Sequence, residues 1–163
     1  MGCYDALNIE FDWLEVALRT ARFPAAAAVS EWIFFYGTLM EPFNRPGRRR
    51  IDPQLIFKGH GTIAAALFDL GIYPAAVPAD GDGARVRGEV YEMKDEIAVL
   101  QVLDEIEGYS PSEPETSLYT RRVTTVTLDS GTPVYAWAYF YNAPLGRAER
   151  IVSGDYLDYL KTR

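Results

Sequence analysis

The sequence predicts one α+β domain in which most strands pair antiparallel. Apolar and aromatic runs typical of strands alternate with turn signals from residue 32 to residue 141. An amphipathic helix over residues 95–106 interrupts them, and Asp129-Ser130-Gly131 has the composition of a hairpin turn. The 163 residues of the chain suit a single hydrophobic core.

Residues 1–30 are interpreted as an N-terminal helical extension that precedes the domain at 31–163. Apolar residues on one face predict a helix from about residue 7 to residue 22: Leu7, Phe11, Leu14 and Leu18. Pro24 ends this helix. It packs on the domain or forms an oligomer contact, so a homodimer is left open.

The first half of the domain is predicted to be mainly strand and loop. Residues 32–36 form a continuous apolar and aromatic run, which indicates a buried strand. A loop rich in Pro and Arg follows to about Pro53. Residues 58–70 are expected to form one long strand or two short ones, and residues 86–93 another. Residues 71–83 carry turn signals and are expected to be loop.

The second half contains the clearest helix and a hairpin. Apolar residues recur every third position over residues 95–106: Ile97, Leu100, Leu103 and Ile106. Asp95 is the expected N-cap, and Gly108 lies where a left-handed residue usually ends a helix. Strands are expected over residues 119–128 and 134–141, and a short closing helix over residues 153–160.

Composition excludes several classes of function. The net charge is −7, from 23 acidic and 16 basic residues, which argues against a nucleic-acid-binding surface. The one basic run, residues 45–50, contains Pro46 and Gly47 and is interpreted as a solvated loop. No stretch approaches the roughly 18 to 20 apolar residues of a membrane span.

Cysteine and histidine are too few for several kinds of site. With Cys3 and His60 as the only residues of their types, an intrachain disulfide and a Cys/His zinc site are both excluded. A reducing cytoplasm is the simplest location. We therefore expect no metal and no cofactor.

Two segments carry residues suited to chemistry. Tyr36-Gly37-Thr38-Leu39 follows a buried strand, where converging backbone N–H groups can hold an anion. Glu107 ends the predicted helix, where the helix dipole and partial burial both raise the pKa of a carboxyl group. Such a carboxyl group suits proton transfer near neutral pH. Taken alone, the first segment is more typical of a plain turn, and Glu107 is more typical of a surface acid at a helix end.

Together with other motifs in the same order, these segments resemble the γ-glutamyl cyclotransferase-like family. The further motifs are Gly71-Ile72-Tyr73-Pro74-Ala75, Val86-Arg87-Gly88-Glu89-Val90-Tyr91, Leu103-Asp104-Glu105-Ile106-Glu107-Gly108-Tyr109, Tyr119-Thr120-Arg121-Arg122-Val123, Ala136-Trp137-Ala138-Tyr139 and Ile151-Val152-Ser153-Gly154-Asp155-Tyr156. The resemblance covers about residues 32–160. It implies a small mixed, mostly antiparallel β-barrel-like sheet with a few flanking helices.

The resemblance also implies a reaction and a site. The α-amino group of a γ-glutamyl substrate attacks its own γ-carbonyl, which releases 5-oxoproline and a free amine or amino acid. This acyltransferase or lyase type of reaction needs no metal. Glu107 is the implied general acid/base. Tyr36, Gly37, Thr38, Leu39 and Tyr119 are the implied substrate-binding residues.

Three carboxylates and two other functions remain as alternatives. Glu105, Asp104 and Glu89 are rivals of Glu107, although Glu105 lies on a different helix face. A non-catalytic module that binds a small amino-acid-like ligand on the same fold is one alternative function. An interaction protein whose N-terminal helix recruits a partner is the other.

Overall fold

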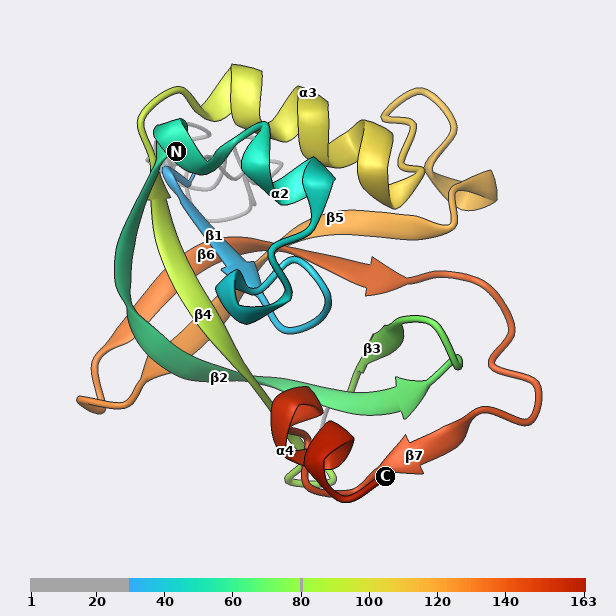
Figure 1. Ribbon diagram of the computed structural model, residues 1–163. Helices are drawn as coiled ribbons and strands as arrows, with labels where there is room; N and C mark the ends of the chain where they lie inside the picture. The colour runs from blue at the N-terminus through green and yellow to red at the C-terminus, as the bar shows by residue number, and fades with distance from the viewer. Residues whose placement is uncertain (1–29, 80) are drawn as a thin grey trace, which may run out of the picture.

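The computed structural model describes residues 30–79 and 81–163. The helix expected over residues 7–22 lies outside these residues, so the helix and its role remain predictions. The elements, labelled in Figure 1, run in the order β1 (Trp32–Phe35), η1 (Glu41–Phe43), α2 (Pro46–Arg49), η2 (Asp52–Gln54), β2 (Leu55–Asp69), β3 (Pro74–Pro78), β4 (Arg85–Met93), α3 (Glu96–Glu107), η3 (Pro114–Thr116), β5 (Tyr119–Leu128), β6 (Pro133–Tyr141), β7 (Glu149–Ile151) and α4 (Tyr156–Lys161).

Five strands close into a barrel-like sheet. They pair in the order β2-β4-β1-β6-β5, and β5 returns to pair with β2 through Gly61 to Ile63. The β1–β6 pair is parallel, and the other pairs around the barrel are antiparallel. The predicted small mixed, mostly antiparallel β-barrel-like sheet is confirmed.

Strand β2 serves two sheets because it is long and irregular. It runs for 15 residues as one strand, which answers the choice left open by the sequence. Its register against β4 shifts between Phe57 and Gly59, a β-bulge that increases local bending and twist. The first part of β2 belongs to the barrel. The last part pairs with β3 on one side and β7 on the other.

The prediction of loop over residues 71–83 is wrong in part, because Pro74–Pro78 forms β3. Prolines are compatible with the first residue of a strand and with an edge strand, and β3 is an edge strand. Strand β7 was also not anticipated, because its three residues give no periodicity. Both strands pair with the last part of β2.

Helix α3 begins and ends as predicted, but only part of its predicted apolar face is buried. The Asp95 carboxylate accepts a hydrogen bond from the Ala98 amide at 3.0 Å, and Gly108 closes the helix with φ 64°. The buried apolar residues are Val99, Leu100 and Leu103, whereas Ile97 is 73% exposed. A three-residue spacing drifts around a helix of 3.6 residues per turn, so its ends leave the buried face.

The basic run was expected to be a solvated loop, and the structure corrects this for Arg48. Residues Pro46–Arg49 form α2, with Pro46 near its start, where proline is tolerated. Arg49 and Arg50 are exposed, but Arg48 is buried. Its guanidinium group stacks over the rings of Phe35 and Tyr91, at 5.2 Å and 4.4 Å from their centroids. Aromatic faces attract and shelter such a cation.

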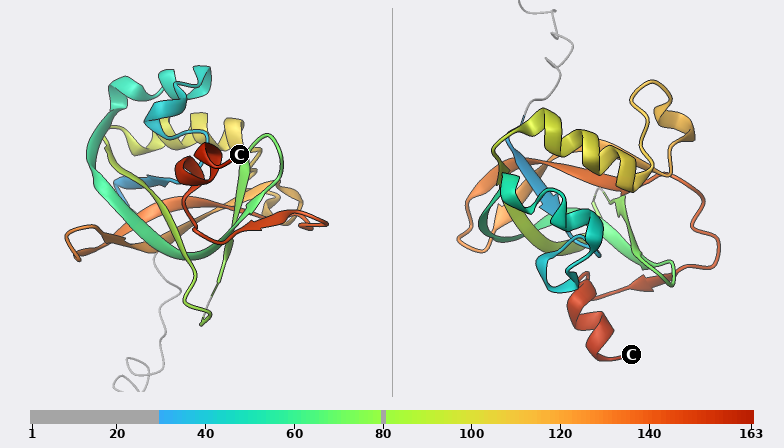
Figure 2. Two further views of the ribbon diagram at one scale, coloured as in Figure 1. Left: turned by 60° about the horizontal axis from the view of Figure 1, so that its bottom comes forward. Right: turned by 45° about the horizontal axis from the view of Figure 1, so that its top comes forward.

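The core fills the barrel and the space beneath α3. Its largest fully buried side chains include Phe34 on β1, Ile63 on β2 and Leu103 on α3. The right view of Figure 2 shows α3 across the top of the molecule and α4 at the bottom. In the parts of the chain that the structure describes, no helix combines the length and the apolar character needed to cross a membrane.

Candidate active site

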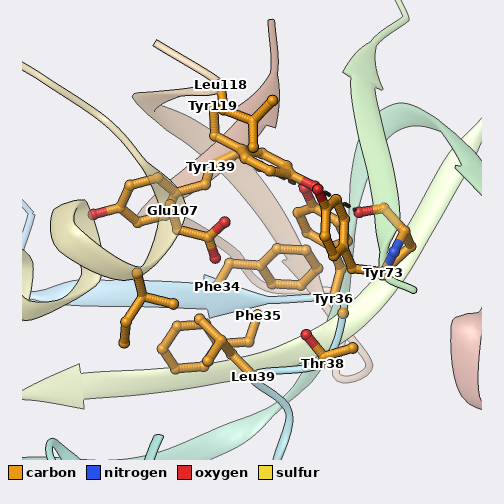
Figure 3. A pocket seen from close by; sticks show the side chains of 13 residues that line it. Phe34, Phe35, Tyr36, Thr38, Leu39, Tyr73, Glu107, Leu118, Tyr119 and Tyr139 are labelled. Atoms are coloured by element: carbon orange, nitrogen blue, oxygen red, sulfur yellow. Dashed lines mark hydrogen bonds between the residues drawn. The ribbon is translucent and has the colours of Figure 1, made fainter. Parts of the chain in front are cut away.

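A pocket of about 280 Å³ opens between the end of β1, the start of β3 and the C-terminal end of α3. Its size suits a small ligand. Figure 3 shows how aromatic side chains surround it. The residues that line it are Phe34, Phe35, Tyr36, Gly37, Thr38, Leu39, Tyr73, Pro74, Ile106, Glu107, Leu118, Tyr119 and Tyr139.

The structure brings all six sequence-predicted site residues to this pocket. Tyr36, Gly37, Thr38 and Leu39 come from the end of β1, Glu107 from the end of α3 and Tyr119 from the start of β5. Antiparallel and parallel pairing around the barrel, rather than local sequence, makes these segments neighbours. The two segments on which the sequence prediction rested therefore line the same pocket.

Glu107 is the one carboxylate among the residues that line the pocket. Its carboxyl group points from the end of α3 into the pocket (Figure 3). Burial raises the pKa of Glu107 from the ordinary value of 4.5 to about 7, because removal from water disfavours the charged form. At neutral pH this carboxyl group therefore exchanges readily between its acid and base forms.

The turn of residues 37–40, called the amide turn below, follows β1. It is closed by a hydrogen bond from the Met40 amide to the Gly37 carbonyl oxygen, at 3.0 Å. Within the described residues, no acceptor is bonded to the backbone N–H groups of Thr38 and Leu39. A β-carbon on residue 37 would lie 2.9 Å from Pro74 Cγ, so only glycine allows this close approach.

The hydroxyl groups of Tyr36 and Tyr119 both bond to the backbone around β3. Tyr36 Oη donates to the Tyr139 carbonyl at 2.7 Å and accepts from the Ala76 amide at 3.3 Å. Tyr119 Oη donates to the Pro74 carbonyl at 3.1 Å. Burial, with a smaller effect of the nearby Glu107 charge, raises the pKa of both phenols. They remain neutral and fix the pocket wall.

A family model described as gamma-glutamyl cyclotransferase, AIG2-like, matches residues 33–158. The chain belongs to this family. The resemblance inferred from the order of the motifs is thus confirmed, and the match covers the whole barrel. The pocket described above is accordingly the candidate active site of a gamma-glutamyl cyclotransferase-like domain.

Individual relatives agree with this assignment. A protein of Methanocaldococcus jannaschii, whose gamma-glutamylcyclotransferase name is provisional, is 31% identical over 129 residues, covering 79% of this chain and 98% of that protein. The solution structure of ytfP from Escherichia coli has 32% identity and a TM-score of 0.55, covering 78% of this chain and 97% of that chain. An AIG2-like protein from Mus musculus has 27% identity and a TM-score of 0.52, covering 70% of this chain and 80% of that chain.

The three rival carboxylates lie outside the pocket of this gamma-glutamyl cyclotransferase-like domain. Glu105 is exposed and pairs with Arg50 at 3.0 Å. Asp104 lies 3.0 Å from Arg121 and accepts a hydrogen bond from Tyr139 at 2.6 Å. Glu89 is buried and accepts a hydrogen bond from the Glu41 backbone N–H at 2.9 Å. Across residues 30–79 and 81–163, no three His, Cys, Asp or Glu side chains gather as a metal site.

Several aromatic and aliphatic residues of the pocket were not predicted. Tyr139 lies in the aromatic strand β6, where side chains alternate between the two faces of the sheet. This alternation assigns Tyr139 to one face but does not show that this face lines a pocket. Of the two loops near this region, 109–118 contributes Leu118 to the lining, and 41–56 contributes no residue.

Proposed function

We propose that this protein is a γ-glutamyl cyclotransferase-type enzyme, which releases 5-oxoproline and a free amine or amino acid from a γ-glutamyl substrate. The observation that carries the proposal is the placement of Glu107, with its raised pKa, in one pocket with the free amides of the amide turn. Family membership supports the same reaction. We propose a cytoplasmic location and a reaction that uses no cofactor.

The substrate supplies its own nucleophile in this reaction. Its α-nitrogen forms a bond to its γ-carbonyl carbon, and the bond from that carbon to the leaving nitrogen breaks. The pocket has to fold the γ-glutamyl arm so that these two atoms meet. Holding reacting groups in place can contribute about 7–11 kcal/mol to lowering a barrier. The aromatic wall of Phe34, Tyr36 and Tyr119 is suited to confining the apolar part of this arm.

Glu107 is proposed to move the protons. The α-ammonium group must lose a proton before it can attack, and a carboxylate with a pKa of about 7 is a competent base at neutral pH. The protonated carboxyl group then donates to the leaving nitrogen as the tetrahedral intermediate collapses. Two protons pass in all from the α-nitrogen to the leaving nitrogen, so the amine departs as its ammonium ion.

The amide turn is proposed to bind negative charge. The free N–H groups of Thr38 and Leu39 are candidate donors to the substrate α-carboxylate and to the oxyanion that develops on the γ-carbonyl oxygen. Tyr119 Oη donates its proton to Pro74, so its lone pairs remain able to accept from the substrate ammonium group. Gly37 keeps the turn close to Pro74 and so keeps the pocket in shape.

A substrate panel tests the proposal. The full chain would be incubated separately with γ-glutamyl-amines, γ-glutamyl-amino acids and glutathione, and 5-oxoproline would be measured by mass spectrometry. Release of 5-oxoproline from at least one member, with the matching free amine in equal amount, is expected. Tight binding of a panel member without any turnover would instead support a non-catalytic binding module.

A further inference from the structure

A buried polar cluster lies beneath the amide turn and takes no part in lining the pocket. Arg48 from α2, and Glu89 and Tyr91 from β4, are 3%, 4% and 5% exposed. Burial of a charge is unfavourable unless it is paired and hydrogen-bonded. Replacement of buried charged residues by apolar side chains of similar volume often leaves the stability of a protein unchanged or raises it. The contacts of these charges therefore indicate what they do.

Arg48 bonds to the backbone within the amide turn, and Glu89 bonds to the backbone directly after it. Arg48 Nη1 donates to the Leu39 carbonyl oxygen at 2.7 Å. Glu89 Oε2 accepts from the Glu41 backbone N–H at 2.9 Å. The Leu39 carbonyl and the Glu41 N–H belong to two successive peptide groups, on either side of Met40. The positively charged Arg48 thus binds one of these peptide groups, and the negatively charged Glu89 binds the next.

The two charged groups are themselves fixed from several directions. Tyr91 donates its hydroxyl proton to the Glu89 carboxylate at 2.9 Å. Arg48 Nε lies 2.7 Å from the Asp52 carboxylate, an ion-pair distance without the alignment of a hydrogen bond. The Arg48 guanidinium group also stacks on the Tyr91 ring. Tyr91 therefore contacts both charged groups.

We infer that Arg48 and Glu89 are positioning residues, which hold the amide turn in the shape that presents the Thr38 and Leu39 N–H groups to the pocket. The inference rests on the proposed function, in which those N–H groups bind the substrate. Donors that are fixed in advance bind the substrate α-carboxylate at a lower cost in ordering. A more mobile turn would still be able to adopt this shape, but it would bind the substrate more weakly.

The first test needs no substrate and measures hydrogen exchange of the Met40 amide. Its acceptor, the Gly37 carbonyl, is unchanged in Arg48→Met, so faster exchange reports a looser turn rather than a deleted partner. At least tenfold faster exchange than in the wild type is expected. Val86→Ala is the control, because Val86 is fully buried on β4 but lies outside the pocket lining and these contacts. Once any change in the free energy of global unfolding is taken into account, Val86→Ala is expected to leave the exchange rate of the Met40 amide unchanged.

The second test separates KM from kcat on a substrate that the wild type turns over. Arg48→Met is expected to raise KM at least tenfold and to leave the pH at which activity falls on the acid side unchanged. A merely structural role would lower kcat through a smaller folded fraction at constant KM. Glu89→Gln keeps an oxygen for the Glu41 N–H, so its KM is expected to stay within about threefold of the wild type.

The outcomes distinguish the two proposals. Absence of 5-oxoproline with the wild-type chain contradicts the proposed function, while the Met40 exchange measurement still decides the positioning role. Met40 exchange in Arg48→Met equal to that of the wild type, or an equal rise in Val86→Ala, overturns the positioning role whatever the activity.

Discussion

Replacement of Glu107 by Gln should stabilise the folded protein at alkaline pH, by an amount that follows from its burial. The pKa of Glu107 rises from 4.5 to about 7 on folding, and one pKa unit corresponds to about 1.36 kcal/mol. The ionised wild-type side chain therefore costs about 3 kcal/mol of folding free energy above pH 7. Glutamine fills the same space without a charge and escapes this cost.

The sign of the pH dependence follows from linkage. A carboxyl group with a raised folded-state pKa supports the folded state fully below about pH 4.5. This support is lost as the pH rises through about 7. The free energy of unfolding of Glu107→Gln minus that of the wild type should thus increase with pH. Between pH 5 and pH 8.5 the increase should be about 2 to 3 kcal/mol.

Urea unfolding of both proteins at pH 5 and pH 8.5 provides the measurement. Glu105→Gln is the matched control, because Glu105 is an exposed carboxylate two positions away that pairs with Arg50. Exposed pairs of this kind contribute about 0–1 kcal/mol, so its pH dependence should follow the wild type. A constant difference between Glu107→Gln and wild type across this pH range would refute the burial argument.

Three further predictions concern turnover, the amide turn and the core. With a γ-glutamyl substrate, kcat/KM should fall on the acid side with an apparent pKa near 7, and a profile that stays flat down to pH 5 would exclude Glu107 as the base. Gly37→Ala should lower kcat/KM at least about tenfold, since its β-carbon would press on Pro74 at 2.9 Å, and steady-state kinetics measure this. Leu103→Ala, at a fully buried position, should lower the free energy of unfolding by about 2–5 kcal/mol in urea titrations, and a loss below about 1 kcal/mol would contradict the assigned core.

Local signals in the sequence predicted the ends of α3 well and its buried face only in part. Asp95 and Gly108 act through hydrogen bonding and backbone conformation within a few residues, which sequence records directly. The buried face depends on how the helix lies on the barrel. That arrangement buries Val99 and exposes Ile97, a choice that spacing every three residues does not make.

Two other features depend on tertiary contacts that the sequence does not display. Pro74–Pro78 becomes strand β3 because β2 bends and offers it an edge, although its two prolines are typical of a loop. Arg48 is buried because Phe35, Tyr91 and Asp52 surround it, although its neighbours in the sequence are exposed arginines. In both cases the long-range environment outweighs local propensity.

The candidate site could be predicted in its residues but not in its geometry. Glu107 and the turn after β1 were paired because several motifs occur in a consistent order. Their position at one pocket depends on tertiary structure, in which the β1 turn, the end of α3 and the start of β5 line the same space. The sequence also did not predict that the Tyr36 and Tyr119 hydroxyls bond to the backbone of β3, through the Ala76 amide and the Pro74 carbonyl. These bonds require the position of β3, which the sequence did not reveal.

The central claim is that Glu107 performs proton transfer in γ-glutamyl ring closure. The most direct measurement is the rate of 5-oxoproline release at pH 8 from the best substrate of the panel, by wild type, Glu107→Gln and Glu105→Gln at equal folded concentration. Loss of at least about 100-fold in Glu107→Gln, with Glu105→Gln close to wild type, is the predicted result. Turnover in Glu107→Gln within a few fold of the wild type would contradict the account.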